Sequence, residues 1–169
     1  MSDSFDYSIE PLGSHHNRAA FSCGSESLDI YLQRQARQDA RKYMAAPYVL
    51  IEKNSGAVIG YYTLSSVGIN MGDLPPEIRN KLPKYPAAPA TLLGRLAVDE
   101  NFQGKGLGEI LLMDALYKSL RNEIASMAVV VDAKDDKARS FYERYDFIRF
   151  PDYPHRLFLP MTVIKKMFK

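Results

Sequence analysis

The chain has 169 residues, a length typical of one domain that buries a sizeable core. Hydrophobic residues make up 46% of it and charged residues 25%, which excludes a disordered or membrane-embedded protein on composition. The net charge of +2 favours no class of partner by itself, so a nucleic-acid-binding surface would have to be a local patch.

The sequence also argues against export and membrane insertion. The N-terminal stretch MSDSFDYSIEPLG lacks the basic and apolar regions of a secretory signal. No apolar run reaches the roughly 18 residues of a spanning helix. Cys23 is the only cysteine, so the chain forms no internal disulfide. We expect a cytoplasmic protein.

The first half of the chain predicts a strand, a helix and a hairpin. Residues 7–12 alternate weakly, as in a short strand, and 47–69 read as two strands around the turn KNSGA. Residues 27–44 have helical periodicity. One predicted side of this helix is apolar and the other is basic. The apolar side holds Leu28, Tyr31, Leu32, Ala36 and Tyr43, and the basic side holds Arg34, Arg37 and Arg41.

The second half predicts a mixed α/β arrangement. Residues 70–90 hold half of the ten prolines and are predicted to form a long irregular excursion. Buried strands are predicted at 90–98 and 126–133, with a helix from about 106 to 124 between them. A short helix is predicted at 135–145. Closing strands are predicted beyond it, with Pro160 at an edge or a bulge.

The loop QGKGLG at 103–108 predicts a phosphate-binding site between a strand and a helix. A Walker loop needs Lys-Ser or Lys-Thr after its last glycine, and the dinucleotide fingerprint needs G-x-G-x-x-G directly after a strand. The first pattern fails here and the second fits poorly. Unpaired N–H groups at a helix start suit a pyrophosphate, and glycines at 104, 106 and 108 allow the backbone to approach it closely.

QGKGLG matches Q/R-x-x-G-x-G/A, and the chain resembles the GNAT family of acyl-CoA-dependent N-acyltransferases. LLGRLAVDENFQGKGLGEILL is similar to the family's motif A, and VVVDAKDDKARSFYERYDFI to its motif B. Asp135 stands where many members have asparagine, and Asp146 where the family usually has glycine. The resemblance implies one α/β (α+β) domain over 1–169, with a mixed central sheet, two splayed parallel strands and flanking helices.

The resemblance also implies the site. Backbone groups of Leu96, Ala97 and Val98 would pair with the pantetheine arm and polarise the thioester of acetyl-CoA. The pyrophosphate would lie on the loop, formed by Gln103, Gly104, Lys105, Gly106, Leu107 and Gly108. Tyr142 would protonate the departing thiolate as general acid. The core-tyrosine alternative stays open for Tyr142, and no metal site is expected from the histidines or Cys23.

FSCGSESLDIYLQRQA at 21–36 resembles the opening of one GNAT branch, the acetyltransferase toxins of type II toxin–antitoxin modules. That branch acetylates the α-amino group of aminoacyl-tRNA and blocks translation. It implies a cognate antitoxin and a homodimer. The alternatives are an acetyltransferase for a small amine, polyamine or protein N-terminus, and a CoA-binding module without catalysis.

Two further observations bear on the substrate. Neither central strand carries a carboxylate or histidine at 91–98 or 126–131, which favours a weakly basic amine such as an α-amine. Basic side chains offer contacts for RNA phosphates, although most such stripes are only solvated faces. These are Arg34, Arg37, Arg41 and Lys42 on the helix, Arg79, Lys81 and Lys84 in the excursion, and Arg95 in the strand. A buried ion pair explains the position of Arg95 in an apolar strand as well as a substrate contact does.

Overall fold

The computed structural model describes residues 6–169 of the chain. Seven strands form one mixed sheet in the order β1-β2-β3-β4-β5-β7-β6. The chain divides into two compact units, one of Met1–Ser65 with Arg95–Ala115 and one of Ser66–Gly94 with Leu116–Lys169. Within 6–169, every helix is too short or too polar to span a lipid bilayer.

The first unit contains an antiparallel hairpin with an added edge strand. The strands are β1 (Tyr7–Pro11), β2 (Ala46–Glu52) and the first part of β3 (Ala57–Asn70). β1 and β3 both run antiparallel to β2, which carries a register shift between Leu50 and Ile51. These strands confirm the strand predicted at 7–12 and the predicted hairpin.

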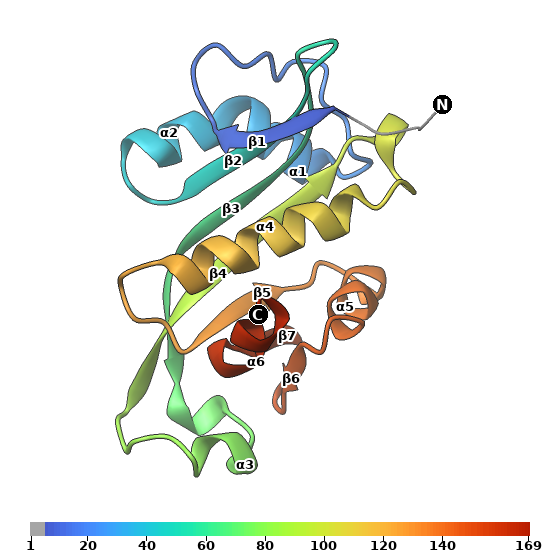
Figure 1. The fold of residues 1–169 in the computed structure, drawn as a ribbon. Coiled ribbons are helices and arrows are strands. Elements are labelled where there is room, and N and C mark those ends of the chain that lie inside the picture. The colour runs from blue at the N-terminus through green and yellow to red at the C-terminus, as the bar shows by residue number, and fades with distance from the viewer. Residues whose placement is uncertain (1–5) are drawn as a thin grey trace. The chain divides into compact units, whose positions relative to one another are not determined.

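The helix of the first unit is interrupted, unlike the single helix predicted over 27–44. It consists of α1 (Glu26–Ile30), a π-helical turn η1 (Tyr31–Gln35) and α2 (Ala36–Arg41). In Figure 1 this segment lies beside β1 and β2. Tyr31, Leu32 and Ala36 are buried and join a core cluster with Phe21 and Tyr61, as the predicted apolar side requires.

Tyr43 does not belong to that apolar side, and the prediction for it is wrong. Its side chain is 95% exposed and its backbone φ is +59°. The helix ends before it, because the Met44 N–H donates to the Asp39 carbonyl and the Tyr43 N–H donates to the Ala40 carbonyl. This is the Schellman pattern, which reverses the chain one residue past the helix cap.

The second unit is built on a parallel strand pair extended by two antiparallel strands. Thr91–Leu93 of β4 (Ala87–Val98) pair in parallel with Val129–Val131 of β5 (Ala128–Asp132). β5 pairs with β7 (Tyr153–Pro160), which pairs with β6 (Ile148–Phe150). Val130 and Phe158 lie in the core cluster of this unit. The buried strands predicted at 90–98 and 126–133 are confirmed.

The helices complete this description. The proline-rich excursion holds η2 (Met71–Asp73) and α3 (Pro76–Arg79), at the end of a long β3–β4 ribbon (Figure 1). The predicted helices at 106–124 and 135–145 are confirmed as α4 (Leu107–Arg121) and α5 (Asp136–Glu143). The closing strand is shorter than predicted, because Pro160 ends it as the N-cap of α6 (Met161–Met167).

Candidate active site

The glycine loop lies between β4 and α4 in the first unit. A short helix, η3 (Glu100–Phe102), follows the strand, and α4 begins at Leu107. Gly104 and Gly106 both have φ of +79°, and a Cβ added at either one would have no heavy atom within 4 Å. The open space and the left-handed backbone are the features of a nest of N–H groups that holds an anion. Gly108 lies inside α4, so it does not share this conformation.

Gln103 connects the loop to its surroundings. Its Nε2 donates to the carbonyl oxygen of Val98 at 2.9 Å and to that of Cys23 at 3.1 Å. The first residue of the motif therefore ties the end of β4 to the chain that precedes α1. This contact positions the loop, and the assignment of Gln103 to the cofactor stays a prediction.

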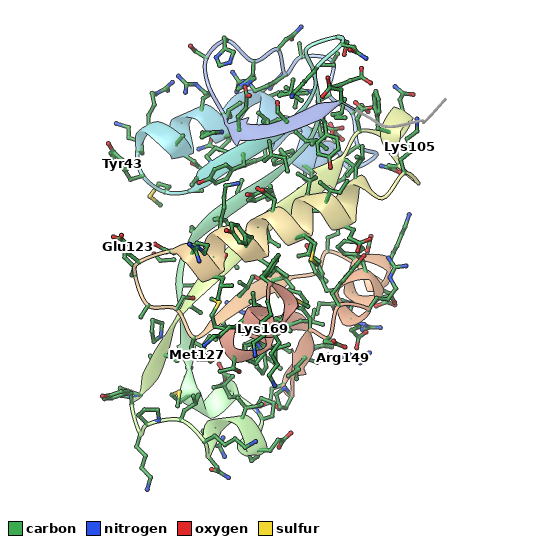
Figure 2. All side chains as sticks on the ribbon, viewed as in Figure 1. Tyr43, Lys105, Glu123, Met127, Arg149 and Lys169 are labelled. Carbon is green, nitrogen blue, oxygen red and sulfur yellow. The ribbon has the colours of Figure 1, made fainter. Side chains whose placement is uncertain are left out.

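Asp99 also fixes the turn between β4 and the glycine loop. The residue is 7% exposed, and its carboxylate accepts from the N–H groups of Ser22 and Asn101 at 3.2 and 2.9 Å. Its own N–H donates to the Ile59 carbonyl at 2.9 Å. The turn from strand to glycine loop is thus fixed by a hydrogen bond within the turn and by hydrogen bonds to two other segments, at Ser22 and Ile59. Figure 2 shows Lys105 on this loop, where its Nζ lies 5.6 Å from the centre of the Phe102 ring.

Leu96, Ala97 and Val98 form the last residues of β4. The parallel pairing recorded between β4 and β5 ends at Leu93, so these three residues continue beyond it. Ala97 is 5% exposed and belongs to the core of the first unit, while Leu96 and Val98 are half-buried. A strand that outruns its parallel neighbour leaves backbone N–H and C=O groups for another partner.

Arg95 precedes these residues and stacks on an aromatic ring. Its Cζ lies 3.5 Å from the centre of the Tyr31 ring, and the Tyr31 hydroxyl donates to Asp39 at 2.7 Å. The pKa of the Asp39 carboxyl is lowered by hydrogen bonds from Gln35 and Tyr31 and by the charge of Arg95. The guanidinium is therefore held by a cation–π contact beside an ionised carboxylate, rather than by the buried ion pair considered from sequence.

The basic residues divide between the two units. Arg34, Arg41 and Lys42 are exposed in the first unit, and Arg37 is half-buried. Arg79, Lys81 and Lys84 belong to the second unit. Arg79 Nη1 donates to the Leu74 carbonyl at 3.4 Å, while Lys81 and Lys84 are exposed. Five of the eight basic residues predicted to contact RNA, including Arg95, therefore lie in the unit that holds the glycine loop.

Tyr142 lies on α5 in the second unit and is 7% exposed. Its ring contacts those of Phe141 and Phe147, with centres 5.2 and 5.3 Å away. Burial raises the pKa of the Tyr142 phenol above its usual value, so the hydroxyl keeps its proton at neutral pH. A general acid needs that protonation state. The same burial suits a core tyrosine.

Two acidic residues shape the ends of α5. Asp135 is its N-cap, and its carboxylate accepts from the Ala138 N–H at 2.8 Å. Asp146 has a φ of +70°, in the left-handed region that glycine occupies most easily. Both departures from the family pattern therefore keep the local backbone: aspartate caps as asparagine does, and Asp146 adopts the turn that glycine would make.

A cluster that the sequence did not suggest joins Glu10, His15 and His16, with one ligand atom from each within 4.8 Å of the others. His16 Nδ1 accepts from the Gly13 N–H at 2.8 Å, which leaves the ring proton on Nε2, 2.6 Å from Glu10 Oε1. His16 therefore offers no lone pair on the side facing Glu10. The hydrogen bond from His16 lowers the pKa of Glu10 and explains the cluster as a structural one.

Glycines in a left-handed backbone, a helix N-terminus behind them and a strand that extends beyond its parallel partner are the features that a phosphate-bearing acyl carrier requires of its site. The family model that matches residues 12–147 is described as "Acetyltransferase (GNAT) family". The chain belongs to this family, as the motifs indicated. The predicted fold class, with parallel β4 and β5 in a mixed sheet, is confirmed.

Two curated relatives are similar over most of their length. The chain is 30% identical over 169 residues to "Probable toxin TacT" of Sinorhizobium fredii, covering 94% of this chain and 93% of the relative. It is 37% identical over 144 residues to "tRNA-acetylating toxin" of Mycobacterium tuberculosis, covering 84% of each. Both names are those of toxins.

Solved structures are similar over nearly the whole chain. One is AtaT complexed with acetyl-methionyl-tRNAfMet, with a TM-score of 0.89 and 29% identity over 97% of this chain and all of that one. Another is a tyrosine-to-phenylalanine variant of AtaT bound to the C-terminus of the antitoxin AtaR. That structure has a TM-score of 0.83 and 26% identity, covering 97% of this chain and 99% of the other.

Proposed function

We propose that this protein transfers the acetyl group of acetyl-CoA to the α-amino group of an aminoacyl-tRNA, and so acts as a toxin that blocks translation. The observation that carries the proposal is the likeness to AtaT complexed with acetyl-methionyl-tRNAfMet, which extends over 97% of this chain. The relative named as a tRNA-acetylating toxin, at 37% identity, supports the same reaction. The left-handed glycines before α4 supply the anion site that acetyl-CoA needs.

Each part of the site has a role in this reaction. N–H groups of the loop 103–108 and the start of α4 hold the pyrophosphate, and the Lys105 ammonium adds charge. Backbone groups of Leu96–Val98 pair with the pantetheine arm and stabilise the oxyanion. The α-amine attacks the thioester carbon, a C–N bond forms and the C–S bond breaks. The departing thiolate takes its proton from Tyr142.

The amine itself explains why a dedicated base is dispensable. An α-amine has a pKa of about 7.7–8.0, so a substantial fraction is neutral at physiological pH, whereas a lysine amine at about 10.4 is almost wholly charged. After the attack the amine nitrogen carries one proton too many. The strands at 91–98 and 126–131 have no carboxylate or histidine that would remove this proton. Bulk water accepts that proton after the attack, and a proton from water restores the Tyr142 phenol.

The wider assembly follows from the same proposal. We infer that residues 1–169 act as one acetyltransferase domain in the cytoplasm, as a homodimer, and that a cognate antitoxin neutralises it. The complex of AtaT with the C-terminus of AtaR supports the antitoxin. Arg34, Arg37 and Arg41, with Arg95 beside the end of β4, would contact the RNA.

The test uses pure protein, acetyl-CoA and a fully charged total tRNA pool. After nuclease digestion, mass spectrometry should detect N-acetyl-aminoacyl-adenosine, and its mass identifies the amino acid. Tyr142→Phe should lower the turnover about 100-fold, the lower range for loss of a general acid, because the ring stays and the proton is lost. Acetyl-CoA binding should not change in this variant.

Two results would contradict the proposal at different points. Absence of any acetylated product from the wild-type protein, while acetyl-CoA still binds, would exclude aminoacyl-tRNA and direct the search to small amines and peptide N-termini. Full turnover by Tyr142→Phe would leave the reaction standing and remove Tyr142 from it.

A further inference from the structure

Tyr43 occupies the position just past the end of α2 where helices most often place glycine. Lys42 is the helix cap, and Tyr43 follows it with a φ of +59°. The hydrogen bonds from Met44 to Asp39 and from Tyr43 to Ala40 fix this geometry. A residue with a Cβ is strained in this region, and a bulky aromatic residue more than most.

Packing does not compensate for that strain. The Tyr43 side chain is 95% exposed, and Met44 beside it is 68% exposed. Figure 2 shows Tyr43 at the end of its helix, pointing away from the ribbon. A strained residue that gains nothing from the core points to a function for the ring itself.

Basic residues of the same helical segment make no ion pair among residues 6–169. These residues are Arg34, Arg37, Arg41 and Lys42. Burial and the neighbouring charge of Arg37 lower the pKa of Arg18, whose Nη1 donates to the Leu32 carbonyl at 3.0 Å. Asp39, the acidic residue of α2, already accepts from Tyr31 and Gln35. The surface holds excess positive charge beside an exposed aromatic ring.

This surface is connected to the end of β4. Tyr31, on the same helical segment, packs under the guanidinium of Arg95, and Arg95 directly precedes Leu96–Val98. Tyr43 lies at the other end of the same segment, past the C-cap of α2.

We propose that Tyr43 is a stacking platform for an unpaired base next to the 3′ end of the tRNA, with Arg41 and Lys42 binding the flanking phosphates. This inference rests on the proposed function and names the contact that holds the single-stranded end. Unstacked bases are recognised by aromatic side chains, and phosphates by cations, so ring and charges together favour RNA over an apolar protein partner.

The binding test compares two synthetic RNA hairpins, one with a single-stranded 3′ overhang and one with a blunt end. The proteins are wild type, Tyr43→Gly, Tyr43→Phe and, as a matched exposed tyrosine on another element, Tyr153→Ala. Tyr43→Gly should bind the overhang hairpin about tenfold more weakly, the scale of one base–aromatic stack, and the blunt hairpin as wild type does. Tyr43→Phe and Tyr153→Ala should bind both as wild type does.

A folding defect cannot imitate this result. Glycine relieves the strain at φ +59°, so Tyr43→Gly should raise the urea midpoint while it weakens RNA binding. Its kcat/KM should fall about tenfold on aminoacyl-tRNA and stay unchanged on aminoacyl-adenosine, which has no flanking nucleotides.

The outcomes separate this inference from the proposed function. Equal binding of the overhang hairpin by wild type and Tyr43→Gly would overturn the stacking role, even if the wild-type protein acetylates aminoacyl-tRNA. If Tyr43→Gly instead lost affinity only for the antitoxin protein, the ring would be a protein contact and the inference wrong. Failure of the wild-type protein to acetylate any aminoacyl-tRNA would refute the proposed function directly.

Discussion

At the residue scale, Gln103 explains how one side chain supports a backbone site. Its amide group donates to two carbonyl oxygens, those of Val98 and Cys23, which belong to different segments of the first unit. Gln103→Glu keeps the shape and removes both donors, so a carboxylate then faces two carbonyls. Because the side chain is exposed, we expect a loss of about 1 kcal/mol in unfolding free energy.

The same substitution should weaken acetyl-CoA binding, because the loop loses its anchor to the end of β4. We expect an increase of about tenfold in Kd, measured by calorimetry, equivalent to the net energy of about one or two hydrogen bonds. Asn101→Asp adds the same charge two residues away and controls for electrostatic repulsion of the phosphates. Equal weakening by both variants would show that charge, and not the anchor, is responsible.

Single residues also show what a sequence predicts and what it leaves open. The places of Tyr142 on α5 and of Gly104 and Gly106 before α4 follow from motif spacing, because local order determines them. The stacking of Arg95 on Tyr31 was beyond prediction, because it joins segments far apart in the chain. The double donation by Gln103 is missed for the same reason.

At the scale of elements, the turn before α4 depends on the backbone conformation of Gly106. Alanine at φ +79° costs about 1–2 kcal/mol, and its Cβ would project into the open space where phosphates would lie. Gly106→Ala should therefore lower the unfolding free energy by that amount and raise the Kd for acetyl-CoA more than tenfold. Both are measured on the purified protein, by urea unfolding and by calorimetry.

Gly68 supplies the matched control for this element. It lies in β3 without a left-handed φ, and an added Cβ there meets no heavy atom within 4 Å. Gly68→Ala should leave acetyl-CoA binding unchanged. If Gly106→Ala bound acetyl-CoA as tightly as Gly68→Ala does, the glycine loop would not be the pyrophosphate site.

The sequence predicts the ends of helices and strands less well than their presence, and each difference from the structure has a physical cause. Helical periodicity continues through Tyr43, but a Schellman turn ends the helix at Arg41, and a π-helical turn shifts the register within it. At the C-terminus, apolar residues continue past Pro160, so the sequence predicts a longer strand than the structure has. Proline fixes φ and lacks an N–H, which ends a ladder and suits the start of a helix.

At the scale of the whole molecule, both compact units bury tyrosines, and this makes stability depend on pH at the alkaline end. Tyr61 and Tyr62 lie in one unit and Tyr142 in the other. Burial raises the pKa of each phenol above its usual value of about 10. The hydroxyl of Tyr61 also donates to the Leu28 carbonyl, and that of Tyr62 to Asp114.

The sign of the effect follows from proton linkage. Below about pH 10 both the folded and the unfolded chain keep these protons, so the contribution to stability is fully present. Above that pH the unfolded chain loses protons that the folded chain retains. The unfolding free energy should then fall by about 1.4 kcal/mol per pH unit for each buried tyrosine, until the folded phenols ionise too.

Urea unfolding at several pH values between about 8 and about 11 measures this slope, and Tyr142→Phe tests one residue's share of it. Phenylalanine keeps the ring contacts with Phe141 and Phe147 and has no proton to lose, so the slope above pH 10 should be shallower by about 1.4 kcal/mol per unit. Tyr43→Phe, at a position 95% exposed, should leave the slope as in wild type. An unchanged slope in Tyr142→Phe would mean that water reaches the phenol in the folded protein. The Tyr142 hydroxyl would then face the site where the amine binds rather than the core.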